Sequence, residues 1–179
     1  MKTKKLGRVI WVTGLSGSGK STLASQVVAQ LRASGETIVM LDGDEMREVF
    51  GATRHNSTNH GREGRLALAM QYAKLCALIA GQGVTVVCST ISMFKEVHSW
   101  NRENQPSYFE VYLKVPLSEL RKRDPKGIYK RFDSGELKYV AGLDLPIDEP
   151  SSPDILFQFE SDLKVSAMTD EMMFKLSKL

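Results

Sequence analysis

The sequence predicts an α/β fold in which a parallel β-sheet is covered by helices on both faces, within one domain spanning residues 1–179. Short apolar runs rich in β-branched residues alternate with amphipathic stretches, an order typical of βαβ units. A glycine-rich loop joins the first apolar run to the first amphipathic stretch. The length of 179 residues, with 42% hydrophobic and 25% charged residues, suits a single globular domain.

The strands are expected where short apolar runs lie between turn residues. The first is the run Val9-Ile10-Trp11-Val12, which is β-branched and aromatic and has glycine on both sides. The same pattern predicts further buried strands at residues 37–41, 84–88, 108–115 and 155–159.

The helices are expected where apolar residues recur every three or four positions. Leu23, Val27 and Leu31 have this spacing, and Gly35 follows as a stop signal. Helices are therefore expected at residues 21–33, 62–80 and 117–122, and a methionine-rich stretch at 168–179 predicts a last helix in core or dimer packing.

Two segments carry neither pattern. Residues 51–61 are polar, and residues 124–153 contain several prolines and glycines. Long irregular segments inside a compact domain are usually functional loops or lids. We therefore expect a lid at approximately residues 123–153.

The segment Gly14–Ser21 reads G-x-x-x-x-G-K-S and lies between the first predicted strand and the first predicted helix. Its glycines allow backbone N–H groups to face phosphate oxygens, and the helix N-terminus adds partial positive charge. Lys20 would lie near the β- and γ-phosphates, and the Ser21 hydroxyl can ligate Mg²⁺. The residues expected to bind ATP here are Gly14, Ser16, Gly17, Ser18, Gly19, Lys20, Ser21 and Thr22.

Two carboxylates follow the second predicted strand, at Asp42 and Asp44. The carboxyl ends of parallel strands line the ligand crevice. One carboxylate can orient or deprotonate an acceptor hydroxyl and the other can hold Mg²⁺, while an Asp at this turn can also simply cap a helix. Arg47 lies one turn beyond Asp44 and suits an anionic substrate.

Composition and charge exclude several classes of protein. A net charge of +3 is too small to indicate nucleic-acid binding, and no apolar run approaches the roughly 20 residues that span a bilayer. Cys76 and Cys88 lie in apolar surroundings and are expected to be reduced thiols. A cytoplasmic protein without nucleic-acid or membrane partners is therefore expected.

Several segments together resemble adenylylsulfate kinase, which uses MgATP to phosphorylate the 3′-hydroxyl of adenylyl sulfate. The resemblance covers nearly the whole chain, and its most specific part is Arg123-Asp124-Pro125-Lys126-Gly127-Ile128-Tyr129-Lys130. The other segments are Val9 to Leu23, Leu41-Asp42-Gly43-Asp44 with Arg47, Ile91-Ser92, and Gly142-Leu143-Asp144 with Pro146 and Pro150.

The resemblance implies a P-loop kinase with ATP and Mg²⁺ as cofactors and a homodimeric state. Asp44 would lie beside the acceptor hydroxyl and would hold Mg²⁺ together with Ser21, so that Asp44 and Lys20 are the catalytic pair. Arg123 would join the ATP site from the lid. The acceptor site would comprise Asp42, Asp44, Arg47, Arg62, Arg65, Ile91, Ser92 and Lys126.

The sequence departs from the family pattern around the acceptor. Arg65 replaces a family asparagine, Val140 replaces a lid phenylalanine, and the other aromatic residue of the adenine pocket has no counterpart in residues 52–65. Stacking a base on an aromatic ring contributes roughly 1–3 kcal/mol, so the preference for adenine is in question. Adenylyl sulfate is the default acceptor. A cytidine diphosphoramidate-type nucleotide, used by a relative in capsule phosphoramidate synthesis, and an inactive nucleotide-binding regulator are the alternatives.

Overall fold

The computed structural model describes residues 6–52, 61–161 and 163–179. In these ranges the chain forms a five-stranded sheet in the order β2-β3-β1-β4-β5. Every neighbouring pair of strands is parallel. The strands are β1 (Val9–Gly14), β2 (Ile38–Asp42), β3 (Thr85–Thr90), β4 (Tyr108–Lys114) and β5 (Ile155–Gln158). The predicted α/β fold is confirmed.

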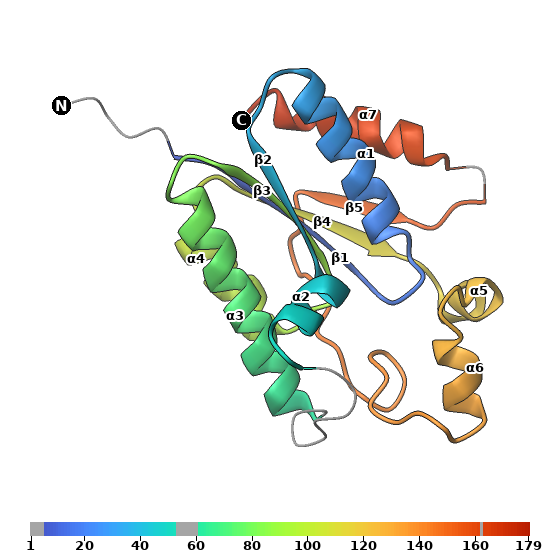
Figure 1. Ribbon diagram of the computed structural model, residues 1–179. Coiled ribbons are helices and arrows are strands. Elements are labelled where there is room, and N and C mark those ends of the chain that lie inside the picture. Colours follow the sequence, from blue (N-terminus) through green and yellow to red (C-terminus); the bar gives the residue numbers. More distant parts are fainter. Residues whose placement is uncertain (1–5, 53–60, 162) are drawn as a thin grey trace.

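Helices cover both faces of the sheet (Figure 1). On one face lie α1 (Lys20–Ala33) and α7 (Val165–Leu176), and on the other α3 (Arg62–Ala80) and α4 (Lys95–Asn104). There are also three short helices in the described ranges. Helix α2 (Gly43–Val49) follows β2, α5 (Leu117–Arg123) follows β4, and α6 (Ile128–Asp133) follows α5. None of the helices in the described ranges is long and apolar enough to cross a membrane.

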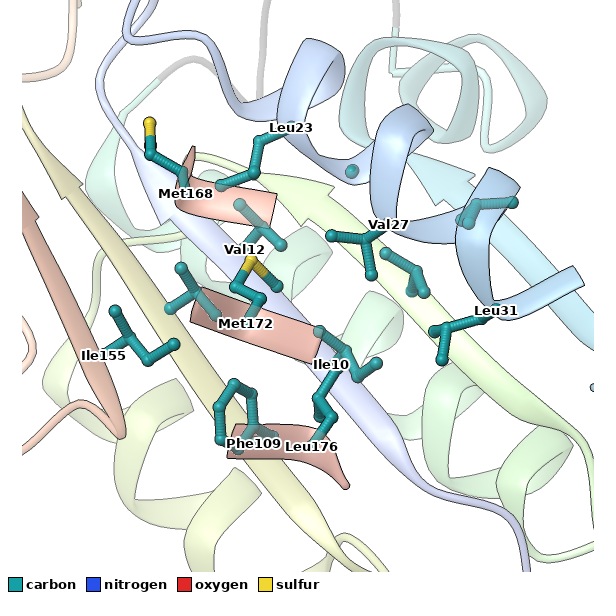
Figure 2. Packing of buried hydrophobic residues seen from close by; sticks show 14 of the residues in the cluster. Ile10, Val12, Leu23, Val27, Leu31, Phe109, Ile155, Met168, Met172 and Leu176 are labelled. Carbon is teal, nitrogen blue, oxygen red and sulfur yellow. The ribbon is translucent and has the colours of Figure 1, made fainter. Parts of the chain in front are cut away.

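The central strand β1 is buried on both sides and divides the core into two clusters. Ile10 and Val12 point toward α1 and α7, whereas Val9 and Trp11 point toward α3 and α4. This alternation follows from the two-residue period of a strand. The methionine-rich helix α7 belongs to the core, where Met172 lies against the sheet near Ile10 (Figure 2).

Three helices, α2, α4 and α6, occur where the sequence patterns predict none. Helix α4 buries the polar side chains of His98 and Asn101 beside Val97, so apolar periodicity does not mark it. Helix α6 has only six residues and begins after Gly127, which has a left-handed φ of 61°. The 124–153 segment is therefore partly helical, whereas residues 53–60 of the other unassigned segment lie outside the described residues.

Candidate active site

The loop between β1 and α1 has the backbone shape that its glycines predict. Gly14, Gly17 and Gly19 have positive φ values of 150°, 79° and 98°. At Gly14 there is also no room for a side chain, because a Cβ would lie 2.6 Å from the carbonyl oxygen of Leu113. The hydroxyl of Ser18 is buried and has no hydrogen-bond partner in the described part of the chain, so the loop keeps a polar atom for a ligand.

The Lys20 side chain folds back over this loop. Its Nζ donates a hydrogen bond to the carbonyl oxygen of Leu15 at 2.8 Å. Burial, and secondly the charge of Lys126, lower the pKa of Lys20 to about 8. A desolvated ammonium group beside a glycine loop is poised to bind phosphate oxygens.

Asp42 lies directly against the P-loop serine. Its carboxylate accepts hydrogen bonds from the Ser21 hydroxyl at 2.6 Å and the Ser89 hydroxyl at 2.7 Å. It also caps α2 by accepting the N–H of Asp44 at 2.9 Å. Partial burial alone would raise the pKa of Asp42, but these hydrogen bonds outweigh it and hold the pKa below its ordinary value.

The pair Ser21–Asp42 offers a hydroxyl and an ionised carboxylate, the oxygen ligands that Mg²⁺ prefers. No group of three or more His, Cys, Asp or Glu side chains that could enclose a metal occurs among the described residues. The Ser21–Asp42 pair therefore fits a magnesium ion that takes most of its ligands from phosphate oxygens and water. The resemblance implies Asp44 as the partner of Ser21 at the metal, whereas in the structure the carboxylate in contact with Ser21 is that of Asp42.

Asp44 faces the segment after β4 rather than Ser21. Its carboxylate forms an ion pair with Lys126, which lies between α5 and α6. Both side chains are more than half exposed, 61% for Asp44 and 52% for Lys126. The two aspartates separate because α2 begins at Gly43, so Asp42 ends a strand and Asp44 starts a helix. This change of backbone direction places Asp42, which contacts the P-loop serine, two residues from Asp44, whose carboxylate is exposed.

Two of the arginines that the resemblance assigns to the acceptor site, Arg47 and Arg65, lie close enough for their charges to interact. Burial, and secondly the charge of Arg47 nearby, lower the pKa of Arg65 to about 10, and Asp144 opposes that shift. Burial raises the pKa of Tyr72 to about 12, although Arg47 beside it acts in the opposite sense. The rings of Tyr72 and Phe50 approach to 5.7 Å. Arg47 and Arg65 thus concentrate two positive charges at one place.

Arg62 is not part of that pair. Its guanidinium group donates to Glu96 at 3.2 Å and to Asp148 at 3.0 Å, and it lies over the ring of Phe94. Two carboxylates therefore already neutralise its charge. The arrangement ties the start of α3 to the start of α4 and to the 123–153 segment, a joining role that the sequence reasoning did not foresee.

Ile91 and Ser92 leave β3 beside the P-loop. The Thr13 hydroxyl donates to the carbonyl oxygen of Ile91. The Ser92 hydroxyl pairs with that of Thr90 at 2.8 Å, and Ser92 is buried with a positive φ of 30°. Both residues lie at the expected strand end, but the Ser92 hydroxyl is engaged within the protein.

The 123–153 segment contacts the P-loop through Tyr129 and Gly142, whereas Arg123, the residue that the resemblance assigns to the ATP site, packs elsewhere. The Tyr129 hydroxyl donates to the carbonyl oxygen of Ser16 at 2.9 Å. A Cβ at Gly142, whose φ is 81°, would meet the Leu15 side chain at 2.9 Å. Arg123 lies over the ring of Phe159, 5.0 Å from its centroid, beside Glu119.

A tight turn near the end of this segment exposes an aromatic side chain. The carboxylate of Asp144 accepts the N–H groups of Tyr139 at 2.7 Å and Val140 at 2.6 Å. Tyr139 has a left-handed φ of 60° and is exposed, whereas Val140 is buried. Non-glycine residues in this conformation need such local support and often mark functional sites. The position of the family phenylalanine is therefore buried, and its neighbour carries the exposed ring.

Comparisons with known proteins agree with this geometry. The family model for adenylylsulphate kinase matches residues 6–158. The cytidine diphosphoramidate kinase of Campylobacter jejuni is 36% identical over 144 residues, covering 80% of this chain and 82% of the relative. The probable adenylyl-sulfate kinase of Aeropyrum pernix is also 36% identical, covering 87% of this chain and 85% of the relative.

A solved structure supports the same assignment. The APS kinase CysC of Mycobacterium tuberculosis, determined in complex with AMPPNP and APS, superposes with a TM-score of 0.87. It is 29% identical, and the superposition covers 97% of this chain and 99% of that one. A family match over most of the chain, relatives above 30% identity and a shared P-loop fold leave one conclusion: this chain belongs to the adenylylsulphate kinase family and is an ATP-dependent kinase.

Proposed function

We propose that this protein transfers the γ-phosphoryl group of ATP to the 3′-hydroxyl of a nucleotide. The observation that carries the proposal is the meeting of two features at the carboxyl edge of the sheet, at the ends of two strands that flank β3. The P-loop lysine and serine lie at the end of β1, and the Asp42–Asp44 pair lies at the end of β2. This arrangement brings a phosphate donor site next to a carboxylate that can orient an alcohol.

The residues of the site divide the work of phosphoryl transfer. The P-loop N–H groups and Lys20 bind the phosphates, and Ser21 with Asp42 would hold the magnesium ion. Magnesium, when bound, neutralises charge on the β- and γ-phosphates. Asp44 orients the 3′-hydroxyl and accepts its proton as the bond to phosphorus forms. Positioning and charge stabilisation supply most of the catalysis in such reactions.

The 123–153 segment acts as a lid in this proposal. Tyr129 already contacts the P-loop, and Lys126 already reaches Asp44 across the site. When both nucleotides are bound, Lys126 would turn from the Asp44 carboxylate, its partner in the structure, toward phosphate oxygens. Closing the lid excludes water, which would otherwise compete with the 3′-hydroxyl for the phosphoryl group.

For the acceptor, the charge of the pocket favours a cytidine diphosphoramidate-type nucleotide. Arg47 and Arg65 together suit a diphosphate-like group better than one arginine and a neutral asparagine would. The buried Val140 offers no ring on which adenine could stack. The similarity to the Campylobacter jejuni kinase supports the same choice.

Adenylyl sulfate is the second candidate acceptor. The family model and the similarity to several adenylyl-sulfate kinases favour it. The exposed ring of Tyr139, one residue before Val140, could stack a purine. A homodimer is proposed on the resemblance alone.

An acceptor panel tests the proposal. The purified protein is given MgATP with cytidine diphosphoramidate, CDP or adenylyl sulfate, and ADP release is followed while ³¹P NMR locates the new phosphate. We expect the highest kcat/KM with the cytidine diphosphoramidate acceptor and a product phosphorylated at the 3′ position. Saturable turnover of adenylyl sulfate at low micromolar concentration would contradict the cytidine assignment. ATP binding without acceptor-dependent ADP release would indicate a regulator.

A charge variant tests the pocket itself. Arg65→Asn should reduce kcat/KM for the diphosphoramidate by about 10–100-fold, the usual worth of a hydrogen bond to a charged group. Lys74→Asn removes an exposed cation from the same helix and is the matched control. Equal effects of the two substitutions would show that the overall positive charge of α3, and not a specific contact made by Arg65, determines acceptor binding.

A further inference from the structure

A buried network behind the active site joins α4, β4 and the last part of the lid. At its centre His98 and Glu110 are 8% and 2% exposed. The Nδ1 of His98 lies 2.7 Å from Oε1 of Glu110, and its Nε2 lies 3.2 Å from the carbonyl oxygen of Asp148. Both ring nitrogens therefore face oxygen atoms.

The surroundings of Glu110 show that its oxygens are acceptors. The Tyr108 hydroxyl donates to Oε1 at 2.9 Å, and Arg102 donates to Oε2 at 3.3 Å. A backbone carbonyl can only accept a hydrogen bond. Satisfying both contacts of His98 requires two protons between the imidazole and the Glu110 carboxylate, one more than a neutral imidazole and a free carboxylate hold.

Asp148 is the point where this network reaches the acceptor side. Its N–H donates to the carbonyl oxygen of Met93 at 2.9 Å, and its carboxylate accepts from Arg62 at 3.0 Å and from the N–H of Lys95 at 3.1 Å. Four contacts, including the one from His98, thus fix this single residue of the lid. Three residues after Arg62, Arg65 faces the lid residue Asp144.

We propose that His98 is a positioning residue whose shared proton with Glu110 holds the lid at Asp148 and thereby sets the lid against the arginines of α3. The expected effect on acceptor binding rests on the proposed function, whereas the expected effect on the lid rests only on the contacts described above. Both contacts of His98 are made only when the imidazole and the carboxylate together hold two protons, because a bare ring nitrogen that faces a carbonyl or carboxylate oxygen is repulsive. Removing the ring nitrogens should therefore loosen the lid at Asp148.

The other charged groups around the pair have partners of their own. Arg102 on α4 also contacts Asp154 at 2.7 Å, and Arg62 on α3 is held between Glu96 and Asp148. Arginines stay protonated throughout the neutral range. Burial, and secondly the charge of Glu110, raise the pKa of Tyr108 well above its ordinary value, so its hydroxyl remains a donor. His98 is therefore the side chain that links Glu110 to the lid.

Hydrogen exchange of the full chain without ligand tests the anchor directly. In His98→Leu, which removes both contacts, protection factors at the amides of Asp148 and Lys95 should fall by about fivefold relative to the wild type, as for one lost hydrogen bond. His98→Gln keeps an N–H donor, so the fall should be smaller. Tyr108→Phe removes a donor to Glu110 without touching Asp148 and should keep the wild-type protection.

Kinetics at saturating ATP provide the second measurement. His98→Leu should raise KM for the cytidine diphosphoramidate acceptor by about fivefold while kcat stays within about twofold. Hydrogen exchange and kinetic constants in His98→Leu equal to those of the wild type would overturn the inference. Failure of every acceptor would contradict the proposed function alone, because hydrogen exchange still decides the role of His98.

Discussion

Single residues decide how the two aspartates of this site divide their roles. Asp42 and Asp44 are two positions apart, yet one faces Ser21 and Ser89 and the other faces Lys126. The difference arises where strand becomes helix at Gly43. A carboxylate that accepts three hydrogen bonds is held in place, whereas an exposed one in an ion pair can exchange its partner for a substrate.

Asp44→Asn should lower kcat by about 100-fold or more, the usual contribution of a general base, because the 3′-hydroxyl loses its proton acceptor. KM for ATP should change little, since Asp44 does not contact the P-loop serine. Steady-state kinetics with the preferred acceptor measure both constants. Glu45→Gln, which removes the next carboxylate of α2, is the control. Near-normal kcat in Asp44→Asn would rule out the assigned role.

The lowered pKa of Lys20 predicts pH-dependent ATP binding. Its pKa of about 8 means that the free protein loses this positive charge as pH rises through that value. Phosphate binding favours the charged form, so the ATP dissociation constant should be steady below about pH 7 and about tenfold larger near pH 9. Calorimetric titration across this range measures it. Lys20→Met should bind ATP weakly with no such pH dependence, and a similar dependence in that variant would assign the titration to another group.

At the scale of elements, α6 connects the proposed lid to the donor site. Burial raises the pKa of Tyr129 to about 12, so its hydroxyl remains protonated and donates to the carbonyl of Ser16 at neutral pH. Asp124 supports the start of the same helix by accepting the N–H groups of Tyr129 and Lys130. The helix is short, and these contacts rather than its own backbone bonds hold it beside the P-loop.

Tyr129→Phe should weaken ATP binding by about fivefold, because the carbonyl of Ser16 loses its donor and the loop loses a support worth roughly 1 kcal/mol. Binding is measured by calorimetry, with thermal denaturation as a check on folding. Tyr139→Phe changes an exposed side chain elsewhere in the same segment and should leave ATP affinity unaltered. Unchanged affinity in Tyr129→Phe would mean that α6 does not support the donor loop.

At the scale of the whole molecule, two apolar clusters on opposite faces of the sheet hold the strand ends in register. Met172 of α7 is fully buried in the cluster that contains Ile10 and Val12 of β1 (Figure 2). The site lies at the carboxyl ends of the strands, so errors in packing on either face would change the spacing between β1 and β2. Stability and catalytic geometry therefore depend on the same core.

Met172→Ala should reduce the free energy of unfolding by about 2–5 kcal/mol, through lost apolar burial and the cavity that remains. Phe174→Ala, on the same helix but 61% exposed, should change it by less than about 0.5 kcal/mol. Urea denaturation of both variants gives the comparison. Similar losses for the two would show that α7 contributes by its helical propensity and not by packing into the core.

Much of this architecture could be predicted from sequence because its signals are local. Strand periodicity, the P-loop spacing and the long helix Arg62–Ala80 depend on neighbouring residues, and each prediction was close. The partners of Asp42 and Arg62 could not be predicted in this way, since Ser89, Glu96 and Asp148 reach them from distant elements. Helix α4 escaped prediction because it buries a polar network instead of an apolar stripe.

The contact between Gly142 and Leu15 joins the lid segment to the donor loop at a position whose backbone favours glycine. Position 142 has a left-handed φ of 81°, and a Cβ there would also press on the flexible end of the Leu15 side chain. A larger residue at position 142 would therefore strain the backbone of the lid segment and displace the Leu15 side chain of the donor loop.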